Sequence, residues 1–353
     1  MRYLLIVVFF AISFTASATT YYVSSSGDDN ANGLSESSAW KTIEKINSVF
    51  STMSPGDKIL FRCGDTFYGS LRITASGRSG NPITISSYGS GEKPVITGFS
   101  NVSYWINEGN GIYSSAVSCS SAPNFITIND RWYAMGRYPD NTYLKYESYS
   151  TNTSITDNEL PASPDWDGAE AVIRKNDWIL DRCIINNHSG NTISYTSKGT
   201  TINATNNYGY FIQNDIRTLT TFGEWFYNGT RLYVYFGSKS PVNYTVRVPS
   251  VNNLIYNSSY DYIDINNIHF RGAIESSINM ERYVDYSSVR NCVFNFSGEH
   301  AIRLHNVRYS TFDGNDINHS VSAGIWQDSS EETSLTNNTV TNSGMLLGAS
   351  LLS

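Results

Sequence analysis

The chain has 353 residues, of which 40% are hydrophobic, 14% aromatic and only 16% charged, and its net charge is −7. This mild acidity, without a basic stripe, argues against nucleic acid and anionic lipid as partners. The length fits one large or two ordinary domains, and the abundance of Tyr, Thr, Ile, Val, Ser, Asn and Gly favours β-structure. We expect a monomer built mainly of strands.

The N-terminus has the layout of a cleavable secretory signal over residues 1–18. Arg2 is followed by an apolar stretch and then by the small residues Ala16, Ser17 and Ala18. The apolar stretch is too short to cross a bilayer comfortably, and no later segment approaches twenty apolar residues, so no transmembrane segment is expected. The sequence therefore predicts a secreted protein, located outside the cell, in a periplasm or on a cell surface.

Residues 19–100 begin with a strand, a helix and a series of short strands. An amphipathic helix is predicted over Ala39–Phe50, where it would cap the N-terminal end of a stack of strands. The turn Asp28-Asp29-Asn30 could hold calcium, although it lacks the spacing of an EF-hand loop and also fits a plain turn; no other cofactor is expected. The predicted strands are Tyr21–Ser24, Lys58–Arg62, Pro82–Ser86 and Pro94–Ile96.

Residues 101–250 are rich in Trp and Tyr and predict a β-rich subdomain. Phe222–Phe236 reads as a hairpin, because Asn228-Gly229 is a strong two-residue turn signal between alternating aromatic strands. We expect most of the aromatic rings of this segment to pack an ordinary sheet core, with a binding surface as the alternative.

Residues 251–353 repeat with a period of 23 or 24 residues. Asn267, Asn291, Asn315 and Asn338 keep this spacing, and two apolar series follow it. Short strands separated by Asn, Gly and Ser turns at this period predict the coils of a parallel β-helix, with the asparagines stacked as a ladder. Leucine-rich repeats have similar lengths but need a leucine scaffold that the sequence lacks. The two apolar series are Ile278, Ile302 and Ile325, and Val293, Ile317 and Val340.

Three phrases between Thr20 and Gly98 carry a family resemblance. They are TYYVSSSGDDNANGLSESSAWKTIEKI, PGDKILFRCGDTFYGSL and GRSGNPITISSYGSGEKPVITG. In this order they resemble the opening of secreted right-handed parallel β-helix proteins of the pectate-lyase-like superfamily. The later phrases NDRWYAMGRYPDN and FGEWFYNGTRLYVYFG resemble an inserted β-domain of certain β-helix glycoside hydrolases.

This resemblance implies an all-β, right-handed, single-stranded parallel β-helix that binds or cleaves polysaccharides. We expect an N-terminal cap and first coils over 19–100, an inserted β-rich subdomain over 101–250 and further coils over 251–353. Only three or four coils follow the insert, so the chain resembles a C-terminally shortened member of the family.

The period places side chains on the outer face of the predicted coils. In the strand before His305, Ile302 and Leu304 take the inward positions, so Arg303 and His305 point outward. Applying one coil step in each direction predicts two outward columns. These are Asn279, Arg303 and Trp326 in the first column, and Glu281, His305 and Asp328 in the second.

These columns form the candidate site. Glu281 and Asp328 would lie two coil steps apart, roughly 9–10 Å between Cα atoms, at the wide end of the carboxylate separations of inverting glycosidases. Trp326 could stack on a sugar ring. The remaining candidates are His305 and Glu299 as catalytic groups, and Arg303, Asn279 and His300 as substrate-binding groups, with no metal. The alternative is a solvated surface ladder without function.

Three functions fit these features. The first is a glycoside hydrolase acting on plant or algal glycans. The second is a polysaccharide lyase, although no lysine follows Lys239, so Arg303 or Arg308 would have to act as the base. The third is a non-catalytic protein that binds glycans with its coil face.

Overall fold

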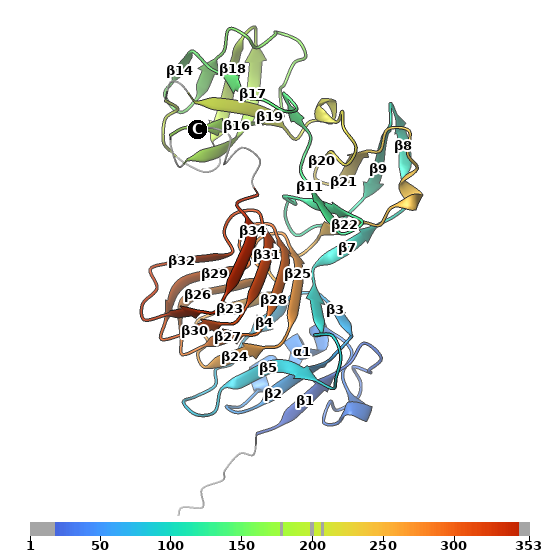
Figure 1. Ribbon diagram of the computed structural model, residues 1–353, viewed down its shortest axis with the longest axis vertical. Coiled ribbons are helices and arrows are strands. Elements are labelled where there is room, and N and C mark those ends of the chain that lie inside the picture. The colour runs from blue at the N-terminus through green and yellow to red at the C-terminus, as the bar shows by residue number, and fades with distance from the viewer. Residues whose placement is uncertain (1–17, 177–178, 198–200, 206–207, 346–353) are drawn as a thin grey trace, which may run out of the picture.

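The computed structural model describes residues 18–176, 179–197, 201–205 and 208–345. The predicted secretory signal therefore lies outside the described residues except for Ala18. In the described ranges, no helix is long and apolar enough to cross a membrane. The molecule consists of a stack of β-strand coils, with antiparallel sheets above and beside it (Figure 1).

Within the described residues, three parallel sheets form the walls of the stack. Sheet A contains β1 (Thr20–Val23), β2 (Lys58–Arg62), β5 (Ile83–Tyr88), β24 (Ile263–Asn266), β27 (Ser288–Arg290), β30 (Thr311–Asp313) and β33 (Ser334–Thr336). Sheet B contains β3 (Thr66–Tyr68), β6 (Val95–Thr97), β25 (His269–Ala273), β28 (Val293–Ser297), β31 (Asp316–Ser320) and β34 (Thr339–Ser343). Sheet C contains β4 (Leu71–Ile73), β23 (Ile255–Ser258), β26 (Ile278–Asp285), β29 (Ile302–Arg308) and β32 (Ile325–Asp328). Each coil passes through sheets C, A and B in turn, which confirms the predicted all-β, right-handed parallel β-helix.

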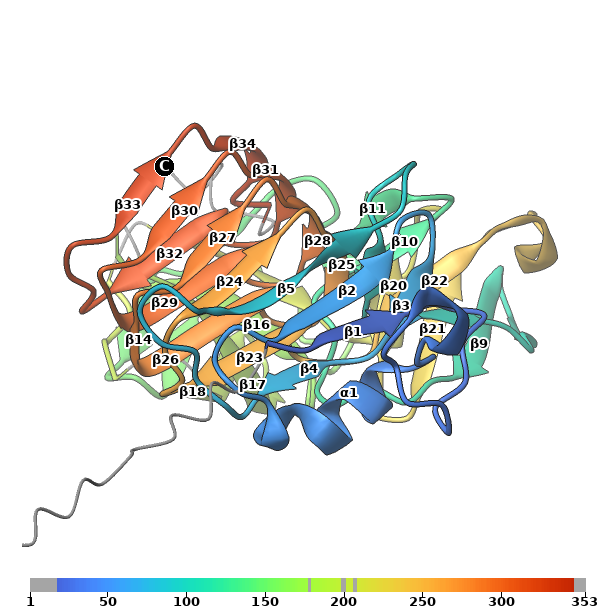
Figure 2. The same cartoon turned by 90° about the horizontal axis from the view of Figure 1, so that it is seen from below.

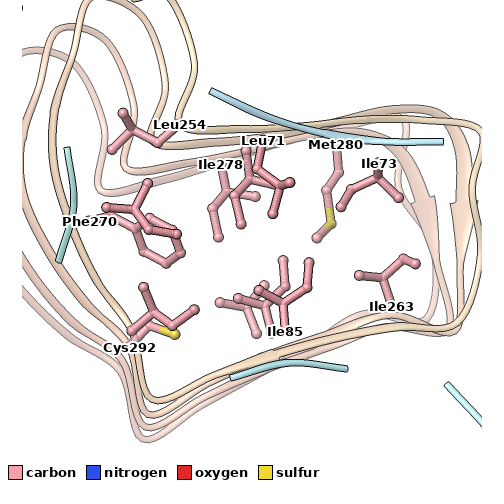
Figure 3. Packing of buried hydrophobic residues seen from close by; sticks show 14 of the residues in the cluster. Leu71, Ile73, Ile85, Leu254, Ile263, Phe270, Ile278, Met280 and Cys292 are labelled. Carbon is pink, nitrogen blue, oxygen red and sulfur yellow. The ribbon is translucent and has the colours of Figure 1, made fainter. Parts of the chain in front are cut away.

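The hydrophobic core fills the inside of the coils (Figure 3). Alternate residues of each strand point inward, so that equivalent side chains of successive coils stack on one another. Phe270 and Phe294 show this, with ring centroids 5.1 Å apart and planes 20° from parallel. Cys292 is buried in the same core as a free thiol.

The register differs from the predicted repeat from Val284 of β26 onward. Glu281 pairs with His305, 24 positions on, whereas Val284 pairs with Val307, 23 positions on. The extra residue is accommodated by a β-bulge at Arg282 and Tyr283, both of which have a positive φ (63° and 66°). The bulge shifts the alignment of every later position in that coil by one residue.

Two predicted alignments are therefore wrong. Phe294, and not Val293, is the inward partner of Ile317. Asn267 and Asn291 take a left-handed turn position, with φ of 57° and 52°, and Asn291 aligns with Gly314 instead of Asn315. Of the four asparagines predicted to stack, Asn315 and Asn338 do so, and the Asn315 amide donates to Asn338 Oδ1 over 2.9 Å.

A short helix caps the N-terminal end of the stack, as predicted. Helix α1 (Ile43–Val49) lies beside β4 at the edge of sheet C (Figure 2). Its Asn47 side chain donates to Ser70 O over 2.9 Å and accepts from Arg72 N over 2.8 Å, so it satisfies backbone groups at that edge. The helix begins later than predicted because Thr42 acts as its N-cap. The 3₁₀ turns η1 (Glu36–Ser38) and η2 (Phe50–Thr52) lie before and after it.

The segment between β6 and β23 leaves the stack, and its described residues form three antiparallel sheets. The first sheet contains β7 (Phe99–Val102), β10 (Ile126–Ile128), β11 (Arg131–Tyr133) and β22 (Val246–Pro249). The second contains β8 (Ile106–Gly109), β9 (Ile112–Ala116), β20 (Trp225–Tyr227) and β21 (Arg231–Tyr235). The third, at the top of Figure 1, contains β12 (Arg137–Tyr138), β13 (Leu144–Lys145), β14 (Ser148–Ser150), β15 (Ser154–Thr156), β16 (Glu170–Arg174), β17 (Leu180–Ser189), β18 (Thr192–Ser197) and β19 (Gly209–Gln213). The 3₁₀ turns η3 (Ile216–Thr218) and η4 (Pro241–Asn243) complete the segment.

The predicted hairpin is formed by β20 and β21, with its turn one residue further along than expected. Tyr227 pairs with Leu232, so the two central turn residues are Gly229 and Thr230. Asn228 directs the turn through its side chain, because its Oδ1 accepts from Thr230 N over 3.1 Å and from Arg231 N over 2.8 Å.

The inserted segment packs back on the coils. Phe99 and Phe125 form a buried cluster with Phe296 and Val321. Asn124 links the two parts, because it donates to Gly298 O over 3.2 Å and accepts from Arg182 over 2.8 Å. The insert is thereby anchored on the turns that lead into the candidate site.

Candidate functional site on the outer face of sheet C

The structure places both predicted columns on the outer face of sheet C. Parallel pairing joins Asn279, Arg303 and Trp326 in one column, and Glu281, His305 and Asp328 in the other. The alternation of inward and outward residues was sufficient to predict both columns. Asn279 and Glu281 precede the bulge in β26, and β29 pairs with β32 without a shift in register. The placement is therefore confirmed, whereas the chemical roles of these residues remain predictions.

Glu281 is held firmly at the centre of this face. Its Oε1 accepts a hydrogen bond from the Tyr256 hydroxyl over 2.6 Å, and Arg303 Nη1 lies 3.3 Å from its Oε2. The side chain is 19% exposed, so it stays in contact with solvent. The β-bulge follows immediately after Glu281, so β26 bends there before its pairing with β29 resumes at Val284.

His305 and Asp328 form the outer half of the second column. His305 Nδ1 lies 3.0 Å from Asp328 Oδ2, and the Asp328 side chain is 50% exposed. Glu281 and Asp328 sit on strands separated by β29, roughly 9–10 Å apart at the usual strand spacing. The structure thus brings two carboxylates to opposite sides of one histidine on an open surface.

Trp326 packs on the preceding coil. Its ring stacks on His300 with centroids 5.5 Å apart, and the Arg303 guanidinium lies 5.1 Å from its centroid. Burial, together with the positive charge of Arg303, lowers the pKa of His300 to about 4. His300 is therefore a neutral imidazole near pH 7, and its Nδ1 accepts from Ala323 N over 3.3 Å.

Glu299 lies in the turn before β29, next to Glu275. Partial desolvation, followed by repulsion from Glu275, raises the pKa of the Glu299 carboxyl above its ordinary value. Glu275 itself is held by Asn252, whose amide donates to it over 2.7 Å. A carboxyl with a raised pKa keeps its proton to a higher pH than an ordinary one, which is the property that a proton donor needs.

Asn279 is less accessible than expected for a substrate-binding group. It points to the outer side but is only 6% exposed, and its Oδ1 accepts from Arg303 over 3.1 Å. It therefore orients Arg303 and does not itself present an open surface.

Two residues of this face were missed from the sequence. Tyr256 pairs with Asn279 and Arg72 pairs with Tyr256, which extends the first column by two coils. They border a hollow of about 490 Å³ together with Asn252 and Asn253. Tyr256 lies 23 positions before Asn279, so one further backward step of the period would have found it.

The residues singled out for calcium serve the local fold. Asp29 accepts hydrogen bonds from the backbone of Lys41 and Thr42 and from the Thr42 hydroxyl, and Asp28 accepts from Asn30. Across the ranges that the structure describes, no group of three or more His, Cys, Asp or Glu side chains is arranged to hold a metal ion. The turn is thus tied to the start of α1.

Comparison with known proteins gives a short sequence match and a broad structural one. No family model matches the chain. A lacto-N-biosidase of Bifidobacterium longum subsp. longum is 47% identical over 88 residues, which are 23% of this chain and 5% of that protein. A solved structure named as a glycoside hydrolase aligns over 93% of this chain and 74% of its own, with a TM-score of 0.75 and 14% identity. This similarity shows the β-helix fold.

A second solved structure, a GH136 lacto-N-biosidase from Eubacterium ramulus, aligns over 92% of this chain and 42% of its own. Its TM-score is 0.39 and its identity 12%. The chain thus spans less than half the length of the two lacto-N-biosidases that it matches.

Proposed function

We propose that this chain is a glycoside hydrolase that binds its glycan on the outer face of sheet C. The observation that carries this proposal is the arrangement of Glu281 and Asp328 on either side of His305, beside Trp326. The 88-residue match to a lacto-N-biosidase supports a carbohydrate-active enzyme. We also propose that residues 1–18 direct its export.

In this proposal Glu281 and Asp328 form the acid and base pair. Their strands lie two coil steps apart, roughly 9–10 Å, at the wide end of the carboxylate separations that leave room for a water molecule in an inverting mechanism. Tyr256 and Arg303 fix the Glu281 carboxylate, while Asp328 contacts His305. Glu299 is a further proton donor because its pKa is raised.

Trp326 and the hollow beside Tyr256 bind the substrate on either side of this pair. Aromatic faces stack on the apolar faces of sugar rings, and amides and arginine bind hydroxyl groups. The hollow offers Arg72, Asn252 and Asn253 for such contacts. We propose plant or algal glycans and oligosaccharides with a terminal lacto-N-biose unit as the substrates to test.

The test is a screen of the purified chain against these glycans and their aryl glycosides. New reducing ends and the absorbance of unsaturated uronates are measured together. We expect reducing ends without unsaturation. We expect Glu281→Gln and Asp328→Asn each to lower the rate about 100-fold or more. Asp316→Asn is the matched control, because Asp316 begins β31 on the outer side of sheet B.

Two results would contradict hydrolysis at this face. Unsaturated products lost in Arg303→Lys would identify a lyase. Glycan binding without any product, abolished by Trp326→Ala, would identify a binding protein.

A further inference from the structure

A second polar groove lies on a different wall of the β-helix, where sheet B meets β7 and β22. It has a volume of about 130 Å³. Two arginines, Arg247 of β22 and Arg271 of β25, point into it from the two parts of the molecule. Its walls are formed by Thr66, Tyr68, Val95, Thr97, Phe99 and Asn101. We call it the arginine groove.

The arginine groove has an excess of positive charge. Both guanidinium groups contact the same oxygen, Oδ1 of Asp130, over 2.5 Å from Arg247 and 2.7 Å from Arg271. Two cations thus share one carboxylate, which leaves one net positive charge. Asp130 lies at the tip of the turn between β10 and β11 and is 54% exposed, so it does not seal the groove.

At least one N–H donor of these arginines does not form a hydrogen bond with any described residue. Arg271 Nε is buried and has no hydrogen-bond partner among the residues that the structure describes. The side chains of Arg247 and Arg271 are 27% and 25% exposed, so both are reachable from solvent. A buried cationic N–H without an acceptor is costly, and an added oxyanion would satisfy it.

The surroundings favour a sugar over a bare ion. Tyr68 is 62% exposed at one end of the groove, and its column continues along sheet B through Thr97 and Arg271 to Asn295 and Asn318. An exposed ring beside amides and hydroxyls suits a saccharide chain, and the planar fork of arginine matches a carboxylate.

We propose that the arginine groove binds the carboxylate of an acidic saccharide such as an oligouronate. Arg247 and Arg271 would pair with the carboxylate, and Tyr68 would stack on a neighbouring sugar. When the groove is empty, Asp130 bridges the two guanidinium groups and offsets part of their repulsion. This site is separate from the face of sheet C.

The test measures binding of oligogalacturonate and of a neutral galacto-oligosaccharide by calorimetry. We expect only the acidic saccharide to bind, with affinity that falls as salt rises. Arg247→Gln and Arg271→Gln should each weaken binding about ten-fold or more. Arg290→Gln, which removes another arginine paired with a single aspartate, should not. Glu281→Gln should also bind normally, which separates this site from the proposed catalytic face.

Asp130→Asn provides a test of opposite sign. It frees both arginines for the ligand, so we expect tighter binding of oligogalacturonate. If the three groups form only a structural ion pair, this variant lowers the melting temperature without any gain in affinity, and the proposal is overturned. Equal binding of inorganic sulfate, or equal binding of the neutral saccharide, would also overturn it.

Discussion

His269 and His300 make the stability of the molecule depend on pH. Burial, with Arg271 and Lys93 nearby, lowers the pKa of His269 to about 4, and His300 behaves similarly. In the unfolded chain each histidine titrates near its ordinary pKa of about 6.5. Between these values the unfolded state binds more protons, so the free energy of unfolding decreases as the pH falls from 6.5 to 4.

We expect each of these histidines to cost about 1–2 kcal/mol of stability at pH 4 relative to pH 7, allowing for partial exposure. His269→Gln should remove its share, so that its unfolding free energy falls less steeply over this range than that of the unmodified chain. Carboxyls with raised pKa values contribute equally to both proteins and cancel in the comparison. Denaturant titrations at several pH values measure the difference, and parallel curves would contradict the assignment.

At the scale of the strand, the observed and predicted registers differ in which residue of β28 points into the core. The observed register places Phe294 there, whereas the predicted repeat aligned Val293 with Ile317. Phe294 is fully buried against Phe270, while Val293 faces outward and is partly exposed. We expect Phe294→Ala to lower the free energy of unfolding by about 3–5 kcal/mol. Val293→Ala should cost less than about 1 kcal/mol. Equal losses would contradict this register.

The same element shows how far the sequence could go. Spacing alone placed Glu281 beside His305 and Arg303 beside Trp326, because alternation and period hold within β26, β29 and β32. The spacing could not show where in the 24-residue coil the extra residue lies, because the coil has the same length wherever a one-residue bulge occurs in it. The bulge depends on two non-glycine residues, Arg282 and Tyr283, taking a left-handed conformation, for which their side chains give no signal.

At the scale of the whole molecule, the contacts between insert and coils could not be predicted. Asp130 meets Arg271 across 141 positions, and Asn124 meets Gly298 across 174. No periodicity links such residues, so the arginine groove and the anchoring of the insert are visible only in the structure. The antiparallel pairing of Val102 with Val246 likewise shows where the insertion leaves and rejoins the stack.

This pairing allows the insert to be removed. Replacing residues 103–245 by Asn-Gly would turn β7 and β22 into a simple hairpin. We expect a folded β-helix whose free energy of unfolding is lower by about 3–6 kcal/mol, because Phe296 and Val321 become exposed to solvent when Phe125 is removed. Circular dichroism and thermal unfolding measure this. A product that stays unfolded, even with Phe296→Ser to remove the exposed ring, would show that the coils need the insert to assemble.

The place of the insertion also separates short-range from long-range pairing in the stack. Ile255 pairs with Ile278, 23 positions away, but its other neighbour in sheet C is Leu71, 184 positions away. Closing the longer loop costs about 1.8 kcal/mol more chain entropy than closing the shorter one. The coils from β23 onward can therefore propagate from one another. The N-terminal coils can also form among themselves, because Lys58 of β2 pairs with Thr84 of β5 only 26 positions away. The step that bears the longer closure is the joining of these two groups of coils. The insertion thus divides one continuous stack into two groups of coils, which meet where β4 pairs with β23, β5 with β24 and β6 with β25.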